Sequence, residues 1–440
     1  MGQRSRILAE IFGFDGWFVN EAYFESTDGV RLVPVQGYSL LRGTRLVLVV
    51  QCRWLPRCSQ CGARCRMRHE RLPVRRWADL SWSGHPLLIE YAPCRVKCRR
   101  CRGAPIEMVA WADPYQRQSR RLQHQLALQS VSMPVLHVAV VHDLSWATVR
   151  RAECRALERW DKTRPPRVLR HVGVDEKYLG RRGKGHRFVT IVSDLDTGEP
   201  IWIGYGRGKN TLRTWLDALT DERKKAIELF AMDMFEAFRV AVRETPGLEH
   251  AAIAHDPFHV MKLAITALDE MRRQVFFRAG PTLRKLGGGR GRRWLLLCAW
   301  ERTDDAQRAE LRRLFSFNST LARAYQLKEQ LRDVLHAPNR ASMDKGLQHI
   351  LRRTQSRRWR ALRHLHDMLS QRREEILALA DHHPRTGRIE ALNNNWEVLV
   401  RRARGYRDHQ YLLLKLKFMT ANPVRTEDGA RRFLDLANAA

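Results

Sequence analysis

The chain has 440 residues, and its 79 lysines and arginines against 47 aspartates and glutamates give a formal net charge of +32. A protein this basic most often binds a polyanion, with nucleic acid as the first candidate, although an arginine-rich composition could give the same charge without such a partner. The longest apolar runs, such as LVLVV and WLLLCAW, fall far short of the roughly 18 residues of a membrane span. The N-terminal apolar stretch is broken and is not a signal peptide, so we expect a cytoplasmic protein with no membrane partner.

The first 50 residues contain the β-like runs GVRLVPV and RLVLVVQ with glycine and aspartate between them, which predict a β-rich segment. Residues 51–115 follow and hold seven of the nine cysteines. Two Cys-x-x-Cys pairs in this region offer four thiolates, the ligands that zinc prefers in a tetrahedral site. The predicted zinc ligands are Cys58, Cys61, Cys98 and Cys101.

We therefore predict a zinc ribbon over residues 51–115, with the run HPLLIEY in its hairpin. Reduced cysteines without metal are the alternative. Other residues that could act as ligands stand close by, namely Cys65, His69, His85 and Cys94.

Residues 116–164 have a helical pattern that favours a helix-turn-helix. The apolar run PVLHVAVVH is followed by a turn at Asp143 and by a helix from Trp146, for which Ser145 is a suitable N-cap. This second helix carries Arg150 and Arg151. A plain pair of antiparallel helices would give a similar pattern, but the total charge favours DNA binding. The double proline of KTRPPR then predicts a linker.

Residues 165–260 predict an α/β sheet in the order β-β-β-α-β-α-β. Three apolar runs end in an acid, at Asp175, Asp233 and Asp256, and His259 follows the last of them. Ligands of open α/β sheets bind at the carboxyl ends of strands, so Asp175 and Asp233 could share a Mg²⁺ or Mn²⁺ ion if their strands are neighbours. An aspartate after a strand is also a common turn former.

Residues 261–384 are helical in pattern, and the stretch 385–440 predicts two more helices, the first starting near Ile389. Glu390 is our candidate for a third metal-binding carboxylate, since Asn393 and Asn394 share its helix face. Two metal ions held by such acids can activate a nucleophile and stabilise the leaving oxygen of a phosphoryl displacement. This chemistry would explain carboxylates gathered at one point of a cationic protein.

Several stretches resemble one known family, among them VGVDEKYLGRRGKGHRFVTIVSDLDTGE, FAMDMFEAFRVAV, AAIAHDPFHVMK, AYQLKEQLRDVL and GRIEALNNNWEVLVRRARGYRD. Together with the cysteine-rich segment, they are similar to the ISL-three family of insertion-sequence transposases. The resemblance runs from about Gly13 to Phe418. The family has a DDE catalytic triad on an RNase H-like fold and an N-terminal zinc-binding domain.

The resemblance implies a multidomain α/β protein. An RNase H-like mixed-sheet core, 165–260 and 385–440, would be interrupted by an all-helical insertion over 261–384 and preceded by the zinc ribbon and the helix-turn-helix. The implied catalytic triad is Asp175, Asp233 and Glu390.

Three further residues are implied as alternatives or supports of that triad. Asp256 could replace Asp233 as the second acid, and His259 would have a structural or phosphate-positioning role. Glu397 stands where the family usually has lysine, two helical turns after Glu390, and is the alternative third acid; Arg404 stands where the family usually has an aromatic residue. The residues expected to contact DNA are Arg150, Arg151, Arg181, Arg182 and Lys184.

The function that the resemblance implies is transposition of DNA by a bacterial, nucleoid-associated enzyme. The zinc ribbon and helix-turn-helix would bind the terminal inverted repeats of an element, and the core would hydrolyse a phosphodiester and join the resulting 3′-OH to target DNA. The partners would be double-stranded DNA and further copies of the same chain. The alternatives are a catalytically silent DNA-binding regulator and an RNase H-like nuclease without strand transfer.

Overall fold

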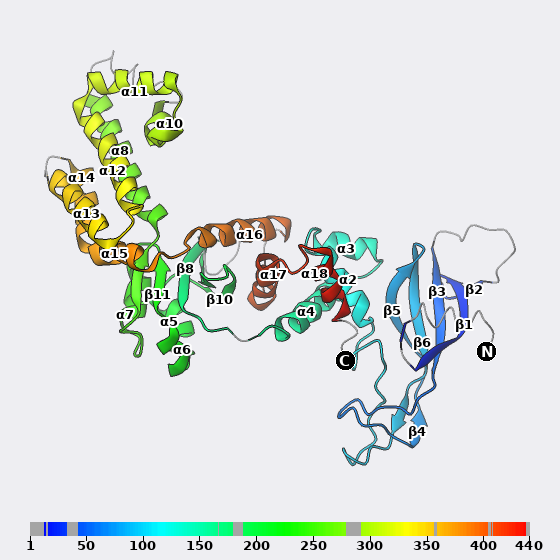
Figure 1. Cartoon of the computed structure of the whole chain (residues 1–440). Helices are drawn as coiled ribbons and strands as arrows, with labels where there is room; N and C mark the ends of the chain where they lie inside the picture. The colour runs from blue at the N-terminus through cyan, green and yellow to red at the C-terminus, as the bar shows by residue number, and fades with distance from the viewer. Residues whose placement is uncertain are drawn as a thin grey trace. The chain divides into compact units, whose positions relative to one another are not determined.

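The computed structural model describes residues 13–14, 16–32, 43–165, 167–178, 188–278, 292–355, 359–403, 406 and 408–436 (Figure 1). These residues form two compact units. The first unit is Met1–Pro165 with Val398–Ala440, and the second is Pro166–Glu397. The chain thus leaves the first unit, forms the whole of the second, and returns to complete the first. No helix among the described residues is long and apolar enough to cross a membrane.

A five-stranded sheet with the order β2-β1-β3-β6-β5 opens the first unit. Its strands are β1 (Trp17–Ser26), β2 (Arg31–Leu32), β3 (Thr44–Cys52), β5 (Arg75–Trp82) and β6 (His85–Tyr91). Neighbouring strands are antiparallel except for β3 and β6, which are parallel. Alternate residues of these strands face an aromatic core in which Trp17 and Trp77 each lie edge-on to Trp111.

This sheet corrects the prediction for the run HPLLIEY, which is strand β6 and not the hairpin of a zinc ribbon. The reason is hydrophobic. Leu87, Ile89 and Tyr91 alternate along β6 and are buried in the aromatic core, which offers them far more apolar contact than a small metal-binding loop. The short ladder beside the cysteines is formed by β4 (Arg68–Arg71) and β7 (Cys94–Val96).

Helices complete the first unit. They are α2 (Arg120–Gln129), α3 (Val135–Val141), α4 (Trp146–Lys162), α17 (His409–Ala421) and α18 (Glu427–Asp435). As expected, Ser145 caps α4, and its side chain accepts a hydrogen bond from the amide of Thr148. Helix α17 packs against α4, and α18 packs against α2. We expected residues 385–440 to close the α/β core; from Val398 onward the chain instead belongs with the first unit.

The second unit contains a five-stranded mixed sheet with the order β10-β9-β8-β11-β12. The strands are β8 (His171–Tyr178), β9 (Phe188–Asp194), β10 (Pro200–Tyr205), β11 (Leu229–Met232) and β12 (Ala252–His255). Strands β8, β9 and β10 form an antiparallel meander, and β8, β11 and β12 run parallel. The connecting helices are α5 (Lys209–Asp217), α6 (Asp221–Ala226) and α7 (Glu236–Arg243). The strands follow in the predicted order, but two helices, α5 and α6, stand between β10 and β11 where one was expected. Every residue of β11 is buried.

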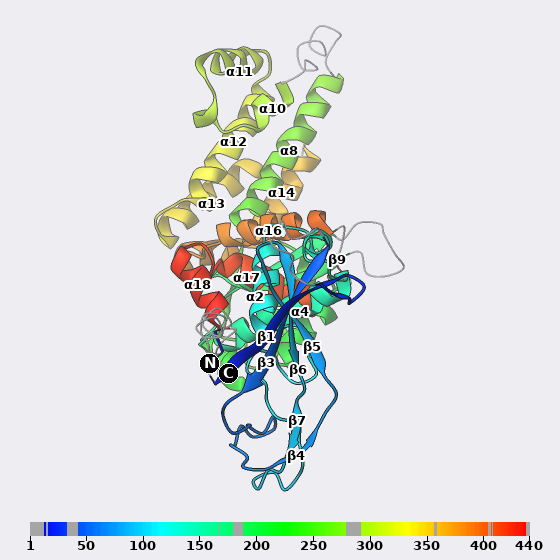
Figure 2. The same cartoon turned by 90° about the vertical axis from the view of Figure 1, so that its right-hand side faces the viewer.

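A helical arm, residues 257–382, follows the sheet and extends away from it (Figures 1 and 2). It is formed by α8 (Pro257–Arg278), α10 (Arg292–Leu297), α11 (Asp305–Phe317), α12 (Ser319–Leu335), α13 (Arg340–Thr354), α14 (Arg360–Gln371) and α15 (Arg373–His382). Helices α8 and α12 lie side by side along the arm. Their leucines and alanines share one apolar core with residues of α13, α14 and α15.

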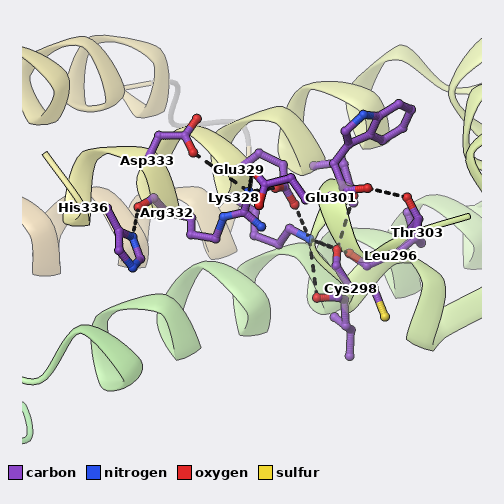
Figure 3. Close-up of polar contacts among 12 residues, drawn as sticks. Leu296, Cys298, Glu301, Thr303, Lys328, Glu329, Arg332, Asp333 and His336 are labelled. Carbon is purple, nitrogen blue, oxygen red and sulfur yellow. Dashed lines mark hydrogen bonds and ion pairs between the residues drawn. The ribbon is translucent and has the colours of Figure 1, made fainter. Parts of the chain in front are cut away.

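A buried lysine fixes the far end of the arm (Figure 3). Lys328 of α12 is 3% exposed, and its ammonium group donates hydrogen bonds to the carbonyl oxygens of Leu296 (3.2 Å) and Leu297 (3.4 Å). These carbonyls end α10, so the lysine acts as a C-cap for that helix. Glu329 balances the charge, because its carboxylate lies 2.7 Å from the Lys328 ammonium and 3.2 Å from the Arg332 guanidinium.

Candidate functional site

Three aspartates come together because of the register of the parallel strands in the second unit. Val174 of β8 pairs with Met232 of β11, and Met232 pairs with His255 of β12. Asp175, Asp233 and Asp256 are the next residue on each of the three strands. They therefore stand in one row at the carboxyl ends of adjacent parallel strands, where α/β sheets bind ligands. Both candidates for the second acid, Asp233 and Asp256, are in this row.

The sequence placed Asp175 at the end of its strand, whereas the structure places it within β8. The parallel pairing with β11 stops at Val174, but the antiparallel pairing with β9 continues to Tyr178, and Asp175 lies opposite Ile191. The apolar run of β8 ends at Asp175 because the neighbouring strand β11 ends at this level. Beyond it, β8 has no strand beside it on that edge in the part of the chain that the structure describes.

Helix α16 (Gly387–Ala403) brings a second set of polar side chains to the three aspartates. Its first turn packs on the sheet, where Ile389 forms a buried cluster with Leu195 and Ala231. The close approach needs Gly173 of β8, because a Cβ atom there would come within 3.2 Å of the Ile389 side chain and within 2.8 Å of Leu195. One turn later, the amide of Asn393 donates a 2.7 Å hydrogen bond to Asp175 Oδ2.

The acids and this face of α16 line a cleft of about 560 Å³. The polar residues of its wall are Asp175, Glu176, Lys177, Asp233, Asp256, His259, Lys262, Thr386, Glu390, Asn393, Asn394 and Glu397. Glu390 and Glu397 are both exposed and both reach this wall, as their seven-residue spacing predicts. The cleft therefore holds every residue that the sequence proposed for the triad or as an alternative to it.

Burial affects the ionisation of two aspartates of the cleft. Desolvation is the largest influence on both Asp233 and Asp256, and it raises the pKa of each. A hydrogen bond from the backbone amide two residues later lowers each pKa. Phe235 N donates to Asp233 Oδ1 (2.9 Å), and Phe258 N donates to Asp256 Oδ1 (3.0 Å). The negative charge of Asp175 raises both pKa values further. A divalent cation held by these oxygens would oppose this rise in pKa.

Glu176 also lines the cleft, although no pattern in the sequence indicates a role for it. Its pKa is raised by burial and by the charges of Asp233 and Asp175, and is lowered by the Arg207 guanidinium, which lies 3.5 Å from Glu176 Oε1. Arg207 stacks over the rings of Phe188 (4.2 Å) and Phe235 (5.5 Å). Only the pairing of β8 and β9 and the loop after β10 bring Arg207 here, so no local sequence pattern indicates it.

The four predicted zinc ligands form a compact cluster in the first unit. All four sulfur atoms lie within 4.8 Å of one another, with 3.8 Å between the sulfurs of Cys58 and Cys101 and 3.6 Å between those of Cys61 and Cys98. Tetrahedral zinc with Zn–S bonds of about 2.3 Å needs sulfurs about 3.8 Å apart. The cluster thus suits one zinc ion.

Backbone amides point at two of these sulfurs. Gln60 N donates to Cys58 Sγ and Cys101 N to Cys98 Sγ, each over 3.4 Å. The hydrogen bond from the Cys101 amide is the largest of several contacts, among them the Arg100 amide and the thiols of Cys61 and Cys58, that together lower the pKa of Cys98 to about 6. This favours the thiolate that a metal requires.

The other possible ligands stay outside this cluster. The thiol of Cys94 donates to Glu107 Oε1 (3.0 Å), and that of Cys65 donates to the carbonyl oxygen of Ala63 (3.6 Å). His85 Nδ1 lies 2.9 Å from the Thr44 hydroxyl in the five-stranded sheet, and His69 is exposed. Among the described residues, the four cysteines are the group with ligand atoms close enough to share one metal ion, while the carboxylates of the acidic cleft are more widely spaced.

The two arginines predicted on α4 differ in their surroundings. Arg150 forms an ion pair with Asp408 and stacks over the ring of Tyr411 at 5.1 Å, so it is engaged by the C-terminal part of its own unit. Arg151 is exposed, and its Nε donates to the carbonyl oxygen of Ala147 one turn back (3.2 Å). Arg151 is therefore the better placed of the two to contact a ligand. The predicted contacts Arg181, Arg182 and Lys184 lie outside the described residues.

A buried ion pair joins α4 to α17 in the first unit. The Lys415 ammonium lies 2.7 Å from Glu153 Oε1, and these side chains are 6% and 2% exposed. The hydroxyl of Tyr411 also donates to Glu153. Because both charges are almost fully buried, each depends on the other.

Replacing Lys415 with Met should lower the free energy of unfolding of the first unit by about 3–5 kcal/mol, because Glu153 would be left buried without its cation. Urea unfolding of the purified chain would measure this. Lys417→Met is the matched control: its ion pair with Asp161 is 22% and 28% exposed, so its loss should cost about 1 kcal/mol or less. Adding Glu153→Gln to Lys415→Met should recover part of the lost stability, and equal costs for the two lysines would contradict the prediction.

Comparison with known proteins agrees with these features. A family described as "Transposase" matches residues 172–416, and one described as "Helix-turn-helix domain of transposase family ISL3" matches residues 107–153. The transposase for insertion sequence element IS1001 of Bordetella parapertussis is 31% identical over 370 residues, which cover 82% of this chain and 87% of that protein. The transposase for insertion sequence element IS1557 of Mycobacterium tuberculosis is 28% identical over 396 residues, covering 84% and 87%. The chain belongs to the ISL3 family of insertion-sequence transposases, the ISL-three family indicated by its sequence.

Proposed function

We propose that the chain cuts DNA at the terminal inverted repeats of an insertion sequence and joins the freed 3′-OH to a target strand. The observation that carries this proposal is the row of Asp175, Asp233 and Asp256 at the point where the parallel pairing of three adjacent strands ends, with α16 beside it. We assign the mixed sheet to an RNase H-like core, residues 165–260 and 385–397, and the helical arm to an insertion in that core.

Asp175 is the proposed first acid, Asp233 the second and Glu390 the third, with Asp256 and Glu397 as the alternatives. Mg²⁺ or Mn²⁺ bound at these carboxylates would supply Lewis-acid activation of the nucleophile and stabilisation of the leaving oxygen. The fit rests on hard oxygen ligands whose burial raises the pKa of Asp233 and Asp256 in the protein alone. The exposed Glu390 and Glu397 can approach because α16 is fixed to the sheet at Ile389.

The remaining groups of the cleft orient the acids. Asn393 holds Asp175 through its 2.7 Å hydrogen bond, and the amides of Phe235 and Phe258 fix one oxygen each of Asp233 and Asp256. His259, one turn into α8 from Asp256, lines the same wall and is proposed to position a phosphate. These contacts pre-set the side chains before substrate arrives, which lowers the cost of reaching the reactive geometry.

The first unit is the proposed reader of the DNA ends. Its helix-turn-helix would present α4 to the major groove, with the exposed Arg151 as the DNA-contacting cation, and zinc bound by the four cysteines would hold the loops around them in place. Phosphate contacts by the basic surface would supply most of the affinity. Assembly of several copies on paired ends is part of the proposal.

The test uses labelled duplexes from the DNA on either side of the gene, incubated with Mg²⁺ or Mn²⁺. Wild-type protein should nick the strand at the repeat end and join a pre-nicked end to target DNA. The variants to compare are Asp233→Asn and Asp256→Asn, because the two aspartates follow neighbouring strands at equivalent positions. Loss of cutting by roughly a thousandfold is expected for Asp233→Asn, with a smaller loss for Asp256→Asn if Asp256 only supports it.

The outcomes separate the rival functions. Nicking without joining would indicate a nuclease, and tight end binding without either reaction would indicate a silent regulator. If Asp256→Asn lost cutting by roughly a thousandfold and Asp233→Asn changed little, Asp256 would be the second acid and Asp233 its support. The presence of all the proposed acids in one cleft gives the silent regulator no support.

A further inference from the structure

A smaller cavity of about 290 Å³ adjoins the acidic cleft in the same unit. It lies between α8 and α14, beside the loop that follows β11. Asp233, His259 and Lys262 line both the cavity and the cleft. A polymer whose reacting group occupies the cleft would therefore have its next unit at the mouth of this cavity.

The lining of the cavity has two chemical parts. Its apolar part consists of Met234, Phe235, Leu263, Ala267 and Ala361, and its polar part of Asp233, His259, Lys262, Thr266, Glu270 and His364. The ring of Phe235 is held in place, since it contacts Phe238 edge-on at 5.3 Å and lies under the Arg207 guanidinium. An aromatic and aliphatic floor suits the apolar base face and sugar of a nucleotide. The ammonium group of Lys262, on the same polar wall as the carboxylates of Asp233 and Glu270, suits its anionic phosphate.

Lys262 is the cation on the wall that the two cavities share. It follows His259 by one helical turn, so the two side chains lie on the same face of α8. Lys262 is exposed, and it forms no ion pair with any other residue in the described parts of the chain, although carboxylates line both cavities. Its charge is thus available to an anion that arrives from outside the protein.

We propose that this cavity is the subsite for the DNA nucleotide next to the scissile phosphodiester, with Lys262 binding its phosphate. The inference rests on the proposed function in one respect, since it takes the scissile phosphodiester to occupy the acidic cleft. The inference also gives the direction of the bound DNA strand, which would run from the row of aspartates along α8 toward α14. His364 of α14 marks the far side of this path.

The test measures equilibrium binding of an end duplex over a range of salt concentrations, using protein that carries Asp175→Asn so that cutting does not interfere. The logarithm of the binding constant falls as the logarithm of salt concentration rises. Adding Lys262→Met should make this slope shallower by about one, because one phosphate contact and its released counterion are lost. Lys225→Met is the control: Lys225 is an exposed lysine of α6 that lines neither cavity, and its replacement should leave the slope unchanged.

A second experiment identifies the phosphate that Lys262 binds. Uncharged methylphosphonates replace the phosphates around the cut site one at a time. At one position beside the scissile phosphate, the methylphosphonate should make the salt slope shallower by about one when the protein carries Lys262. In the Lys262→Met protein, the same methylphosphonate should cause no further change in the slope. An unchanged slope in Lys262→Met, or effects that add fully at every position, would overturn the subsite.

These measurements also separate the subsite from the proposed function. Absence of cutting by the wild-type protein would count against the enzyme, while the binding data would still show whether Lys262 contacts a particular phosphate. Cutting that depends on the aspartates, combined with an unchanged salt slope in Lys262→Met, would retain the enzyme and reject the subsite.

Discussion

Replacing Asp175 with Asn should reduce DNA cutting by roughly a thousandfold or more while leaving affinity for end DNA within about twofold, because metal-assisted charge stabilisation contributes several kcal/mol to such a reaction. The change keeps the size of the side chain and leaves an oxygen that can accept from Asn393. It also removes a charge that raises the pKa of Asp233 and Asp256, so the folded protein should be no less stable. Single-turnover cutting of a labelled duplex, together with thermal unfolding, measures both effects.

Asp217→Asn is the control for this prediction. Asp217 ends α5, is 53% exposed and pairs with Arg213 along the helix, so its loss should leave cutting unchanged. The assignment of Asp175 would fail if Asp175→Asn cut DNA at a normal rate. It would fail equally if end binding were lost to the same extent as cutting, since the acid would then serve the fold or DNA recognition.

Replacing Cys98 with Ser should reduce bound zinc from about one ion per chain to almost none and unfold the loops around the cluster. Four sulfurs spaced for one ion lose tetrahedral coordination when one is replaced, and structural zinc in small domains contributes on the order of 10 kcal/mol. Metal analysis of the purified protein and limited proteolysis between Cys58 and Glu107 would measure this. End binding should weaken in parallel.

Two other cysteines provide controls for the zinc prediction. Cys298→Ser changes an exposed cysteine of the helical arm, and Cys94→Ser changes a buried thiol that is bonded to Glu107 and not to the cluster. Both proteins should keep their zinc. Loss of zinc in Cys94→Ser but not in Cys98→Ser would mean that a different set of ligands binds the metal.

Local signals in the sequence were sufficient to predict much of the site. The two Cys-x-x-Cys pairs predicted the cysteine cluster, because each places two sulfurs on one side of a turn. Asp233 and Asp256 each end a buried run, so their position at strand ends was readable from the alternation of apolar residues and turns. The spacing of Glu390, Asn393 and Glu397 gave their common helix face.

What the sequence could not provide were contacts between distant strands and helices. HPLLIEY looks like one half of a hairpin, and only its parallel pairing with β3 shows that it belongs to the five-stranded sheet. Glu176 pairs with Arg207, and Lys262 and His364 line one cavity, through tertiary packing, for which no spacing rule exists. The place of α17 and α18 was missed for the same reason, since their contacts with α4 and α2 join segments far apart in the sequence.

The return of the chain to its first unit has a consequence for synthesis on the ribosome. Helices α2 and α4 emerge early, but α17 and α18, which pack against them, follow more than two hundred residues later, a delay of roughly 10 to 50 s at about 5–20 residues per second. During that interval Glu153 has no lysine beside it. A chain whose translation stops anywhere in the α/β sheet or the arm would lack Lys415 as well, and such a fragment should be degraded before it can occupy DNA ends. Only a finished polypeptide, which already contains the acidic cleft, would then hold a stable first unit, the proposed reader of the DNA ends.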